Sequence, residues 1–345
     1  TRGGVENYAL KITAAAVQAG WRVSAAFPQT ENTNALIEEV KAAGAHYYKL
    51  RITETEIPTL TAIDEKHQAL LPVLKQLILP RIQFDLGVVS HFFKTLLIGA
   101  KLRPDVIMVV LPWPDFGLGS LLACGFLKIP ALVVFQLAPY PLSMGKIKLK
   151  LYRWARRRQQ KWIGVSHSNC RCIRQSFHLA DEDISCIYNG AAYHADLASD
   201  ASTLRRQVRR ELGLSETSRI ALTVARLNDQ KGHDCLIPAI PLLKRDFPGL
   251  KFVWVGEGER KNDLLRLLEA YECTDQVLLL GHRVDVPRLL RASDLFVFPT
   301  YYEGQPFALL EAMACGLPVI STKTDGIPEV IEHRVHGLLT RKGDS

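Results

Sequence analysis

The sequence predicts an α/β protein built from two domains, each with a parallel sheet wrapped by helices. Strand-like apolar runs alternate with amphipathic helical stretches through most of the chain, which is the pattern of parallel strands joined by crossover helices. The chain has 345 residues, more than one ordinary domain holds. Hydrophobic residues make up 48% of it, which is enough for two cores.

Short apolar runs mark the expected strands, and the amphipathic segments between them mark the expected helices. In the first half, the strands are expected at Arg22–Phe27, Val106–Val110, Ala131–Phe135 and Trp162–Val165, with helices at Glu6–Ala19 and Thr33–Ala43. In the second half, the strands are expected at Arg219–Val224, Lys251–Val255, Gln276–Leu280, Asp294–Pro299 and Pro318–Ser321. The helices there are expected at Lys261–Ala270, Val286–Ala292 and Phe307–Ala314.

A turn followed by small residues predicts the domain boundary. Asn189-Gly190 follows the apolar run Ile184–Tyr188, and small residues then continue to Thr203. We therefore expect an N-terminal domain over residues 1–192 and a C-terminal domain over residues 193–345. The chain opens on the glycine turn Gly3-Gly4 without a preceding strand and stops without a closing helix, so we expect a fragment that lacks both.

The cysteine content, the apolar stretches and the charge indicate in which compartment the protein works and what it can bind. Seven scattered cysteines match neither a disulfide framework nor a zinc site, so we expect reduced thiols and a cytoplasmic protein. The longest apolar stretch is far shorter than the ~20 residues that a membrane-spanning helix needs. The net charge is +8, and residues 146–161 alone hold eight basic residues and no acidic one. Nucleic acid, an anionic membrane or a phosphorylated substrate each fits such a segment.

The segment after the predicted strand Asp294–Pro299 has the features of an anion site. We expect Pro306 at the first helical position, because its missing N–H is one that a helix leaves unpaired. The free N–H groups at Gln305–Ala308 then form an anion site at the carboxyl end of a strand. Glu303 is expected at the mouth of the loop, and Glu311 inside the helix, where its carboxylate can accept two ribose hydroxyls. An ordinary strand–loop–helix unit with two solvated glutamates is the alternative.

A second strand-end loop carries two cations. Arg226 and Lys231 lie five residues apart, after the strand Arg219–Val224 and before a helix. Arginine can grip two phosphate oxygens while lysine supplies a point charge, so the pair suits a diphosphate. An exposed turn with incidental charges is the alternative explanation.

Two more loops add to the same edge of the predicted sheet. Gly256-Glu257-Gly258 follows the strand Lys251–Val255, and its glycines allow the backbone to approach a ligand closely. The loop Thr324–Glu329 follows the strand Pro318–Ser321. Four strand-end loops with phosphate- or hydroxyl-binding chemistry in one domain indicate a ligand site more strongly than any one of them.

In order and spacing, these residues resemble family 4 of the retaining glycosyltransferases, which have the GT-B fold of two Rossmann-like domains facing a central cleft. The similarity is close over Ala221–Leu339 and looser over Gly3–Asn189. It rests on Gly3-Gly4-Val5-Glu6, Val165-Ser166-His167-Ser168, Asn189-Gly190, Ala225-Arg226 through Lys231-Gly232, Gly256-Glu257-Gly258, Glu303 with Glu311, and Gly326-Ile327-Pro328-Glu329.

The resemblance implies a role for each matching residue. Arg226 and Lys231 would neutralise the diphosphate of the donor as the sugar–phosphate bond breaks, and Glu303 would position the transferred sugar, so these three are the expected catalytic residues. The other expected donor-binding residues are Gly3, Gly4, Gln136, Gly256, Gly304, Gln305, Pro306, Phe307 and Glu311, the last of which would hold the ribose.

The resemblance also implies the reaction. A hexosyl group would pass from a UDP- or GDP-sugar to a glycan, lipid-linked or small-molecule acceptor with retention of configuration, as in polysaccharide biosynthesis. We expect neither a metal nor a cofactor, because arginine, lysine and a helix dipole would stabilise the leaving charge. The acceptor is expected beside Gly3–Tyr8, Trp113–Gly119 and Gln136–Tyr140 of the N-terminal domain, and no nucleic-acid partner is expected. A nucleotide-sugar epimerase of the same fold is a second enzyme hypothesis, which the paired glutamates and cations disfavour.

One position departs from the family pattern. Many relatives carry a histidine directly after the strand Ala131–Phe135, where this chain has Gln136. Glutamine can donate a hydrogen bond to a sugar hydroxyl but cannot titrate. His91 and His167 are candidate substitutes, although isolated histidines are more often structural. A nucleotide-sugar-binding protein with little or no transferase activity is therefore the alternative function.

The basic segment predicts an amphipathic helix. Ile147, Leu151, Trp154 and Ala155 fall on one helical face, with cations on both sides of it. Such a helix suits the surface of an anionic membrane, which would make the protein peripheral on the inner membrane face. A helix packed on the core with a solvated basic back is the alternative.

Overall fold

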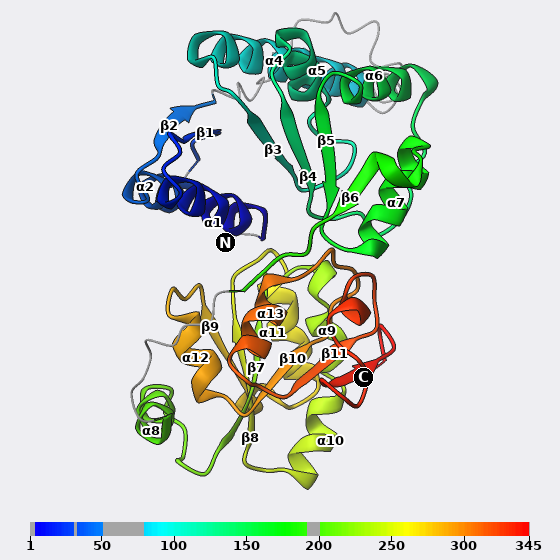
Figure 1. Cartoon of the computed structure of the whole chain (residues 1–345). Helices are drawn as coiled ribbons and strands as arrows, with labels where there is room; N and C mark the ends of the chain where they lie inside the picture. Colours follow the sequence, from blue (N-terminus) through cyan, green and yellow to red (C-terminus); the bar gives the residue numbers. More distant parts are fainter. Residues whose placement is uncertain (1–3, 31–32, 51–78, 192–200, 345) are drawn as a thin grey trace, which may run out of the picture.

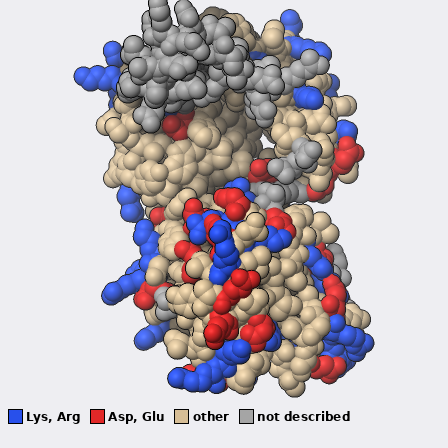
Figure 2. Space-filling model, turned by 180° about the vertical axis from the view of Figure 1, so that it is seen from behind, with Lys and Arg blue, Asp and Glu red and all other residues tan. Residues whose placement is uncertain are grey.

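The computed structural model describes residues 4–30, 33–50, 79–191 and 201–344, which form two α/β domains arranged one above the other (Figure 1). The N-terminal domain is the upper one in this view, and the C-terminal domain lies below it. The space-filling view from behind shows the same two lobes with a narrower waist between them (Figure 2). The residues discussed below as the site lie where the two lobes meet.

Four parallel strands form the main sheet of the N-terminal domain, in the order β3-β4-β5-β6. They are β3 (Ile107–Leu111), β4 (Ala131–Phe135), β5 (Gln160–Gly164) and β6 (Ile184–Cys186). The central strand β4 is buried on both faces. Val133 and Phe135 pack against the core beneath the later helices, whereas Val134 packs on the other face near Tyr8. Both faces are covered, as in parallel sheets generally.

The rest of the N-terminal domain consists of a small parallel pair of strands and the helices. The pair is β1 (Ser24–Phe27) with β2 (His46–Lys49). The helices are α1 (Gly4–Gln18), α2 (Asn34–Ala42), α4 (Leu79–Leu102), α5 (Leu118–Leu127), α6 (Lys146–Arg156) and α7 (His167–Phe177).

The C-terminal domain has a sheet of six parallel strands in the order β12-β11-β10-β7-β8-β9. They are β7 (Arg219–Val224), β8 (Leu250–Val255), β9 (Val277–Gly281), β10 (Leu295–Phe298), β11 (Val319–Thr322) and β12 (Leu338–Thr340). Along β7, Ile220 and Leu222 face one core while Ala221 between them faces the other. Helices therefore cover both faces, and the loops that follow β7, β10 and β11 emerge side by side at one edge.

The helices of this domain are α8 (Ala201–Glu211), α9 (His233–Leu236), α10 (Ala239–Asp246), α11 (Lys261–Ala270), α12 (Val286–Ala292) and α13 (Phe307–Ala314). Among the described residues, no helix has both the length and the apolar character that a membrane crossing requires.

The structure confirms the α/β class, the parallel sheets and the expected strands to within a few residues. Five elements coincide with the predicted ranges: β4, β7, α11, α12 and α13. The predicted boundary between residues 192 and 193 lies outside the described residues; β6 ends at Cys186 and α8 begins at Ala201.

The sequence interpretation did not assign α4 and α5 as helices. Gly119 and Gly125 inside α5 weaken its helical propensity, but both positions are needed for packing. A Cβ at Gly119 would lie 2.1 Å from the carbonyl oxygen of Val88 in α4, and one at Gly125 would lie 3.0 Å from the Trp154 ring. The two glycines therefore let α5 pack closely against its neighbours on each side.

Candidate functional site

Two strand-end loops of the C-terminal domain bring a predicted cation and a predicted acid together. Lys231 lies in a 3₁₀ turn after β7, Glu303 lies in the loop after β10, and their side chains form an ion pair. The hydroxyl of Thr300 donates a second hydrogen bond to the same carboxylate oxygen at 3.0 Å. Both charged side chains are largely buried, so this geometry is held from several sides.

Backbone contacts hold these two loops in register. The amide of Tyr301 donates to the carbonyl of Gln230 at 2.8 Å, and the Gln230 side chain donates back to the carbonyl of Tyr302 at 2.8 Å. Gly232 lies at φ +63°, and a Cβ there would fall 2.0 Å from the carbonyl oxygen of Pro299. Glycine is thus required at this position for both conformation and space.

Arg226 lies on the same loop, five residues before Lys231, and its surroundings differ from those of the ion pair. Its side chain is exposed, and none of the carboxylates in the described residues pairs with it. An exposed guanidinium without an acidic partner is free to grip a phosphate bidentately. The structure therefore places the two predicted cations on one loop, one paired and one open.

The helix α13 begins at Phe307, as its predicted range has it, and Pro306 lies just before it. Pro306 adopts an extended conformation (ψ 125°) and is the N-cap residue, whereas Phe307 is the first helical residue. The expectation that Pro306 occupies the first helical position is therefore wrong. An extended N-cap is the ordinary geometry of a helix start, and Pro306 contributes no N–H in either case.

The first helix of the N-terminal domain faces the start of α13. Gly4 at the beginning of α1 lies against the ring of Phe307, at 3.8 Å from the position of a Cβ. The ring of Tyr8 is 6.5 Å from the same ring, and the ammonium of Lys11 lies 4.6 Å above it. The structure thus brings together Gly4 and Phe307, two of the expected donor-binding residues, while Gly3 lies outside the described residues.

Lys11 was missed by the sequence interpretation and lies beside a predicted ligand-binding acid. Its ammonium contacts the Glu311 carboxylate at 3.1 Å across the two domains. Gly4, Tyr8 and Lys11 lie at positions i, i+4 and i+7 of α1, which puts them on one face. That spacing was readable from the sequence, but nothing in the sequence indicated which helix the face would meet.

The interdomain contact depends on two glycines that allow backbones to touch. A Cβ at Gly304 would fall 1.9 Å from the carbonyl oxygen of Gln136 in the other domain. A Cβ at Gly326 would fall 1.9 Å from the carbonyl oxygen of Gly304 and 2.9 Å from the hydroxyl of Ser166. Any larger residue at either position would push the two domains apart.

Asn189 links two predicted site residues, Gln136 and Gln305. Its side-chain nitrogen donates to the carbonyl of Gln305 at 2.9 Å and lies 3.3 Å from the side-chain oxygen of Gln136. Its backbone amide donates to the side chain of Gln305. All three side chains are buried. The Gln305 side chain therefore has a partner in the connection between the domains.

This network fixes the orientation of Gln136. A backbone carbonyl can only accept, so the atom of Asn189 that faces it must be the amide nitrogen. The Gln136 atom facing that nitrogen must then be its oxygen, which leaves the Gln136 nitrogen as a donor. That nitrogen is buried and has no hydrogen-bond partner among the described residues. A buried donor without a partner is costly, which points to a functional use.

The glycines after β8 support the neighbouring loop. Gly256 lies at φ +145°, and a Cβ there would fall 2.0 Å from the carbonyl oxygen of Ala225. A Cβ at Gly258 would fall 2.2 Å from the carbonyl oxygen of Leu227. These glycines therefore let the backbone after β8 pack closely against the Arg226 loop of the same domain. Direct contact of Gly256 with a donor stays a prediction.

The loop after β11 reaches across to the N-terminal domain. The carboxylate of Glu329 accepts hydrogen bonds from the backbone amides of His167 and Ser168 at 2.7 Å each, and from the hydroxyl of Tyr188 at 3.0 Å. In the same loop, Asp325 accepts from the amide of Glu303 at 2.8 Å, and burial raises the pKa of this carboxyl. This loop thus supports the Glu303 loop and also contacts α7.

His91 and His167 were the candidates for the role of the histidine that Gln136 replaces, and each packs against other residues. His167 packs edge-on against Tyr188 at 5.8 Å between ring centroids. His91 lies in α4, where burial and Lys94 lower its pKa. No group of three or more His, Cys, Asp or Glu side chains suited to a metal ion occurs within the described ranges.

Two aromatic residues predicted on the acceptor side meet. Trp113 follows β3, Tyr140 follows β4, and their rings lie edge to face with centroids 5.6 Å apart. Tyr140 also raises the pKa of Tyr302, after the larger effect of burial, so it is near the donor loop of the other domain. This pair forms an aromatic surface next to the site.

Sequence models of two families cover most of the chain. The model described as Glycosyltransferase Family 4 matches residues 2–192, and the model described as Glycosyl transferases group 1 matches residues 205–345. The chain belongs to glycosyltransferase family 4.

Similar proteins agree with this assignment. The chain is 32% identical to N-acetyl-alpha-D-glucosaminyl L-malate synthase of Bacillus anthracis over 52% of this chain and 46% of that protein. It is 31% identical to UDP-Gal:alpha-D-GlcNAc-diphosphoundecaprenol alpha-1,3-galactosyltransferase of Escherichia coli over 53% of this chain and 51% of that one. The match thus spans about half the length of these curated relatives.

Solved structures show that the fold is GT-B. A glycosyltransferase from Rickettsia africae superposes with a TM-score of 0.73 at 16% identity, covering 98% of this chain and 81% of that one. Anabaena Alr3699/HepE in complex with UDP and glucose superposes with a TM-score of 0.69 at 20% identity, covering 100% and 84%. The two-domain prediction from the sequence is confirmed at this level.

Proposed function

We propose that the family 4 chain is a retaining hexosyltransferase that takes a UDP- or GDP-sugar as donor and needs no metal. The observation that carries the proposal is the contact between Lys231 and Glu303, which lie 72 residues apart in the sequence. It joins a cation suited to a diphosphate to an acid suited to a sugar. Arg226 on the same loop supplies a second, exposed cation.

In this reaction the bond between the anomeric carbon and the phosphate oxygen breaks, and the nucleoside diphosphate leaves with the electron pair. Arg226, Lys231 and the N-terminus of α13 stabilise the charge that develops on it. The acceptor hydroxyl attacks the anomeric carbon from the face that the diphosphate leaves, and its proton passes to the leaving phosphate oxygen. Glu303 and the buried amide nitrogen of Gln136 orient the sugar by accepting and donating hydrogen bonds.

Donor identity is proposed from chemistry and from relatives. The Anabaena protein in this fold has been solved with UDP and with UDP-glucose, so UDP-sugars are the first donors to test. The acceptor is proposed to be a glycan, a small molecule or a lipid-linked sugar, and the Trp113–Tyr140 surface can stack on a sugar ring. A cytoplasmic location suits the seven cysteines, all of which have free thiols.

Release of the nucleoside diphosphate tests the proposal. We expect slow release of UDP or GDP from one of a panel of nucleotide sugars, at the same rate with and without a chelator. Lys231→Ala should lower this rate by at least about a hundredfold, the size seen when one hydrogen-bond donor that stabilises the charge of a transition state is removed. Lys244→Ala is the matched control, since Lys244 also pairs with a carboxylate in this domain, that of Asp275.

Three results would contradict the proposal. Turnover that strictly requires Mg²⁺ or Mn²⁺ would refute metal independence. Inversion at the anomeric carbon of the product would refute retention. A donor that binds, raising the melting temperature, but is never turned over with any acceptor would favour the alternative, a nucleotide-sugar-binding protein.

A further inference from the structure

The helix α6 has an inner face on the core and an outer face that combines apolar and basic side chains. Tyr152 and Ala155 are fully buried, whereas Ile147 is 78% exposed and Leu151 and Trp154 are also exposed. The expectation that Ala155 shares a face with Ile147, Leu151 and Trp154 is therefore wrong. Ala155 turns inward with Tyr152, because the core meets the helix on that side.

Most cations of this segment are left without an acidic partner. Two of the eight are neutralised: Lys148 contacts Asp115 at 3.2 Å, and Arg156 contacts Asp183 at 2.6 Å. Within the described residues, no carboxylate pairs with Lys150, Arg157 or Arg158. Arg153 donates to the backbone carbonyls of Phe177 and His178 rather than to an acid. The unpaired charges lie on the outer face.

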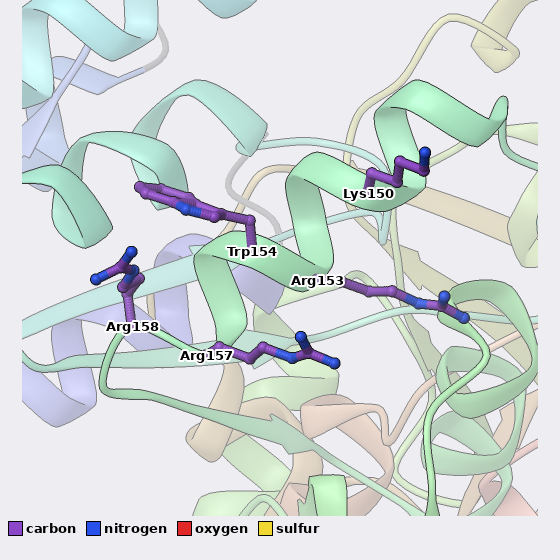
Figure 3. Close-up of a pocket in the computed structure, with 5 residues that line it drawn as sticks. All are labelled: Lys150, Arg153, Trp154, Arg157 and Arg158. Carbon is purple, nitrogen blue, oxygen red and sulfur yellow. The ribbon is translucent and has the colours of Figure 1, made fainter.

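These cations surround a shallow hollow beside the indole ring. The hollow has a volume of about 540 Å³ and is lined by Lys150, Arg153, Trp154, Arg157 and Arg158 (Figure 3). The Arg158 guanidinium lies 5.1 Å from the centre of the Trp154 ring, and the two side chains are next to each other in the figure. Its lining contains four cations and no acid, so the hollow attracts anions.

The indole ring lies over the neighbouring helix α5. A Cβ at Gly125 of α5 would fall 3.0 Å from the Trp154 ring. We name the set of Ile147, Lys150, Leu151, Trp154, Arg157 and Arg158 the α6 surface. Large exposed side chains gathered beside cations are unusual on a surface that faces only water.

We propose that the α6 surface docks on an anionic phospholipid bilayer. The cations bind lipid phosphates, while Ile147, Leu151 and Trp154 enter the boundary between headgroups and acyl chains. The apolar side chains decide between the ligands that a basic segment fits, since a phosphorylated sugar or a nucleic acid has no acyl region to receive them. In Figure 1, α6 lies at the top of the N-terminal domain, so a bilayer bound there would lie on the side of the molecule away from the C-terminal domain.

A second basic helix, α8, differs from α6 because two of its arginines form ion pairs with an acidic residue of the same domain. In α8, Arg205 and Arg209 both pair with Asp294, and Arg209 is buried. On the face of the molecule in Figure 2, basic and acidic side chains are mixed over the C-terminal domain. The exposed Arg206 and Arg210 of α8 therefore offer a matched control for the cations of the α6 surface.

Co-sedimentation of the full chain with vesicles tests the proposal. We expect binding to vesicles of phosphatidylcholine with phosphatidylglycerol, little binding to phosphatidylcholine alone, and release by salt. Each cation near a charged surface contributes roughly fivefold in affinity, so Lys150→Glu with Arg157→Glu should weaken binding by at least about twentyfold. Arg206→Glu with Arg210→Glu makes the same charge change and should leave binding within about twofold.

The apolar contribution needs its own variant. Trp154→Ala should weaken binding to anionic vesicles by about tenfold, while Trp21→Ala, which removes an exposed tryptophan elsewhere in the same domain, should not. Equal binding to neutral and anionic vesicles, or no binding to either, would overturn the proposal. So would an equal loss in the α8 pair. Release of UDP or GDP in solution should be unchanged in all four variants, which separates this test from that of the transferase.

Discussion

The carboxylate of Glu329 in the C-terminal domain accepts the backbone N–H of Ser168 in the N-terminal domain at 2.7 Å. The amide of His167 donates to the other oxygen at the same distance, so one side chain caps the first turn of α7 from across the domain interface. A negative charge at a helix N-terminus is favourable because it meets free N–H groups and the positive end of the dipole. This contact therefore fixes how the two domains of the transferase face each other.

Removal of this cap should loosen the interface. We expect Glu329→Ala to lower the free energy of unfolding by about 1 kcal/mol, because three hydrogen bonds to a partly exposed carboxylate are lost. Glu329→Gln should recover part of it. Glu332→Ala, an exposed acid three residues on, is the control for thermal unfolding. An unchanged melting temperature in Glu329→Ala would show that the interface does not need the cap.

Asn189 should act on turnover through Gln136. Asn189→Ala removes the donor that fixes the Gln136 amide, so Gln136 can rotate and present its oxygen to the sugar. We expect release of the nucleoside diphosphate at saturating donor to slow about tenfold, the cost of one misplaced hydrogen bond in a transition state, while the donor KM changes little. Gln136→Ala should have the same effect, and the double variant should add nothing further. Additive losses would mean that Asn189 acts independently.

Glu311 should contribute much more than Lys11 to the affinity for the donor. If Glu311 accepts two ribose hydroxyls, Glu311→Ala should raise the donor KM by about tenfold or more. Lys11→Ala removes only its partner and should change the KM by about threefold at most, since the pair is partly exposed. Titration with UDP alone gives the same comparison without turnover. If Lys11→Ala raised the donor KM more than Glu311→Ala, the lysine and not the glutamate would be the residue that contacts the donor.

His233 should make the protein sensitive to acid. Burial lowers its pKa to about 3 from the ordinary 6.5, with Lys231 adding to the effect, and neither ring nitrogen has a partner among the described residues. A lowered folded-state pKa gives stability above pH 6.5 that is lost as the pH falls toward 3. At pH 5 the loss should be about 2 kcal/mol. His233→Leu should flatten stability between pH 7 and pH 5, whereas His46→Leu, at an exposed position, should not.

The parts of the fold that the sequence predicted are those with local signals. The strand β7 and the helix α13 have clear apolar periods and clear stops, so their ranges were predicted correctly. The helices α4 and α5 lack such signals, because their glycines and apolar residues serve contacts between helices. The strand β2 has only four residues and an irregular burial pattern, which gives no alternation to detect.

The site was predictable within the C-terminal domain and not across the interface. Arg226 and Lys231 follow β7, and Glu303 and Glu311 follow β10, its parallel neighbour in the sheet. The rule that the loops after parallel strands share one edge brings them together. Lys11, Asn189 and the Glu329 cap depend on how two separately folded sheets meet. No spacing in the sequence encodes that, so these three contacts had to come from the structure.

Two of the cations at the predicted donor site already have carboxylate partners, Lys231 with Glu303 and Lys11 with Glu311. A diphosphate that enters must therefore compete with a carboxylate for each of these lysines, and gains less than it would from bare charges. Inorganic phosphate has no sugar or ribose to satisfy the released acids. We therefore expect these ion pairs to make the site select a complete nucleotide sugar over inorganic phosphate.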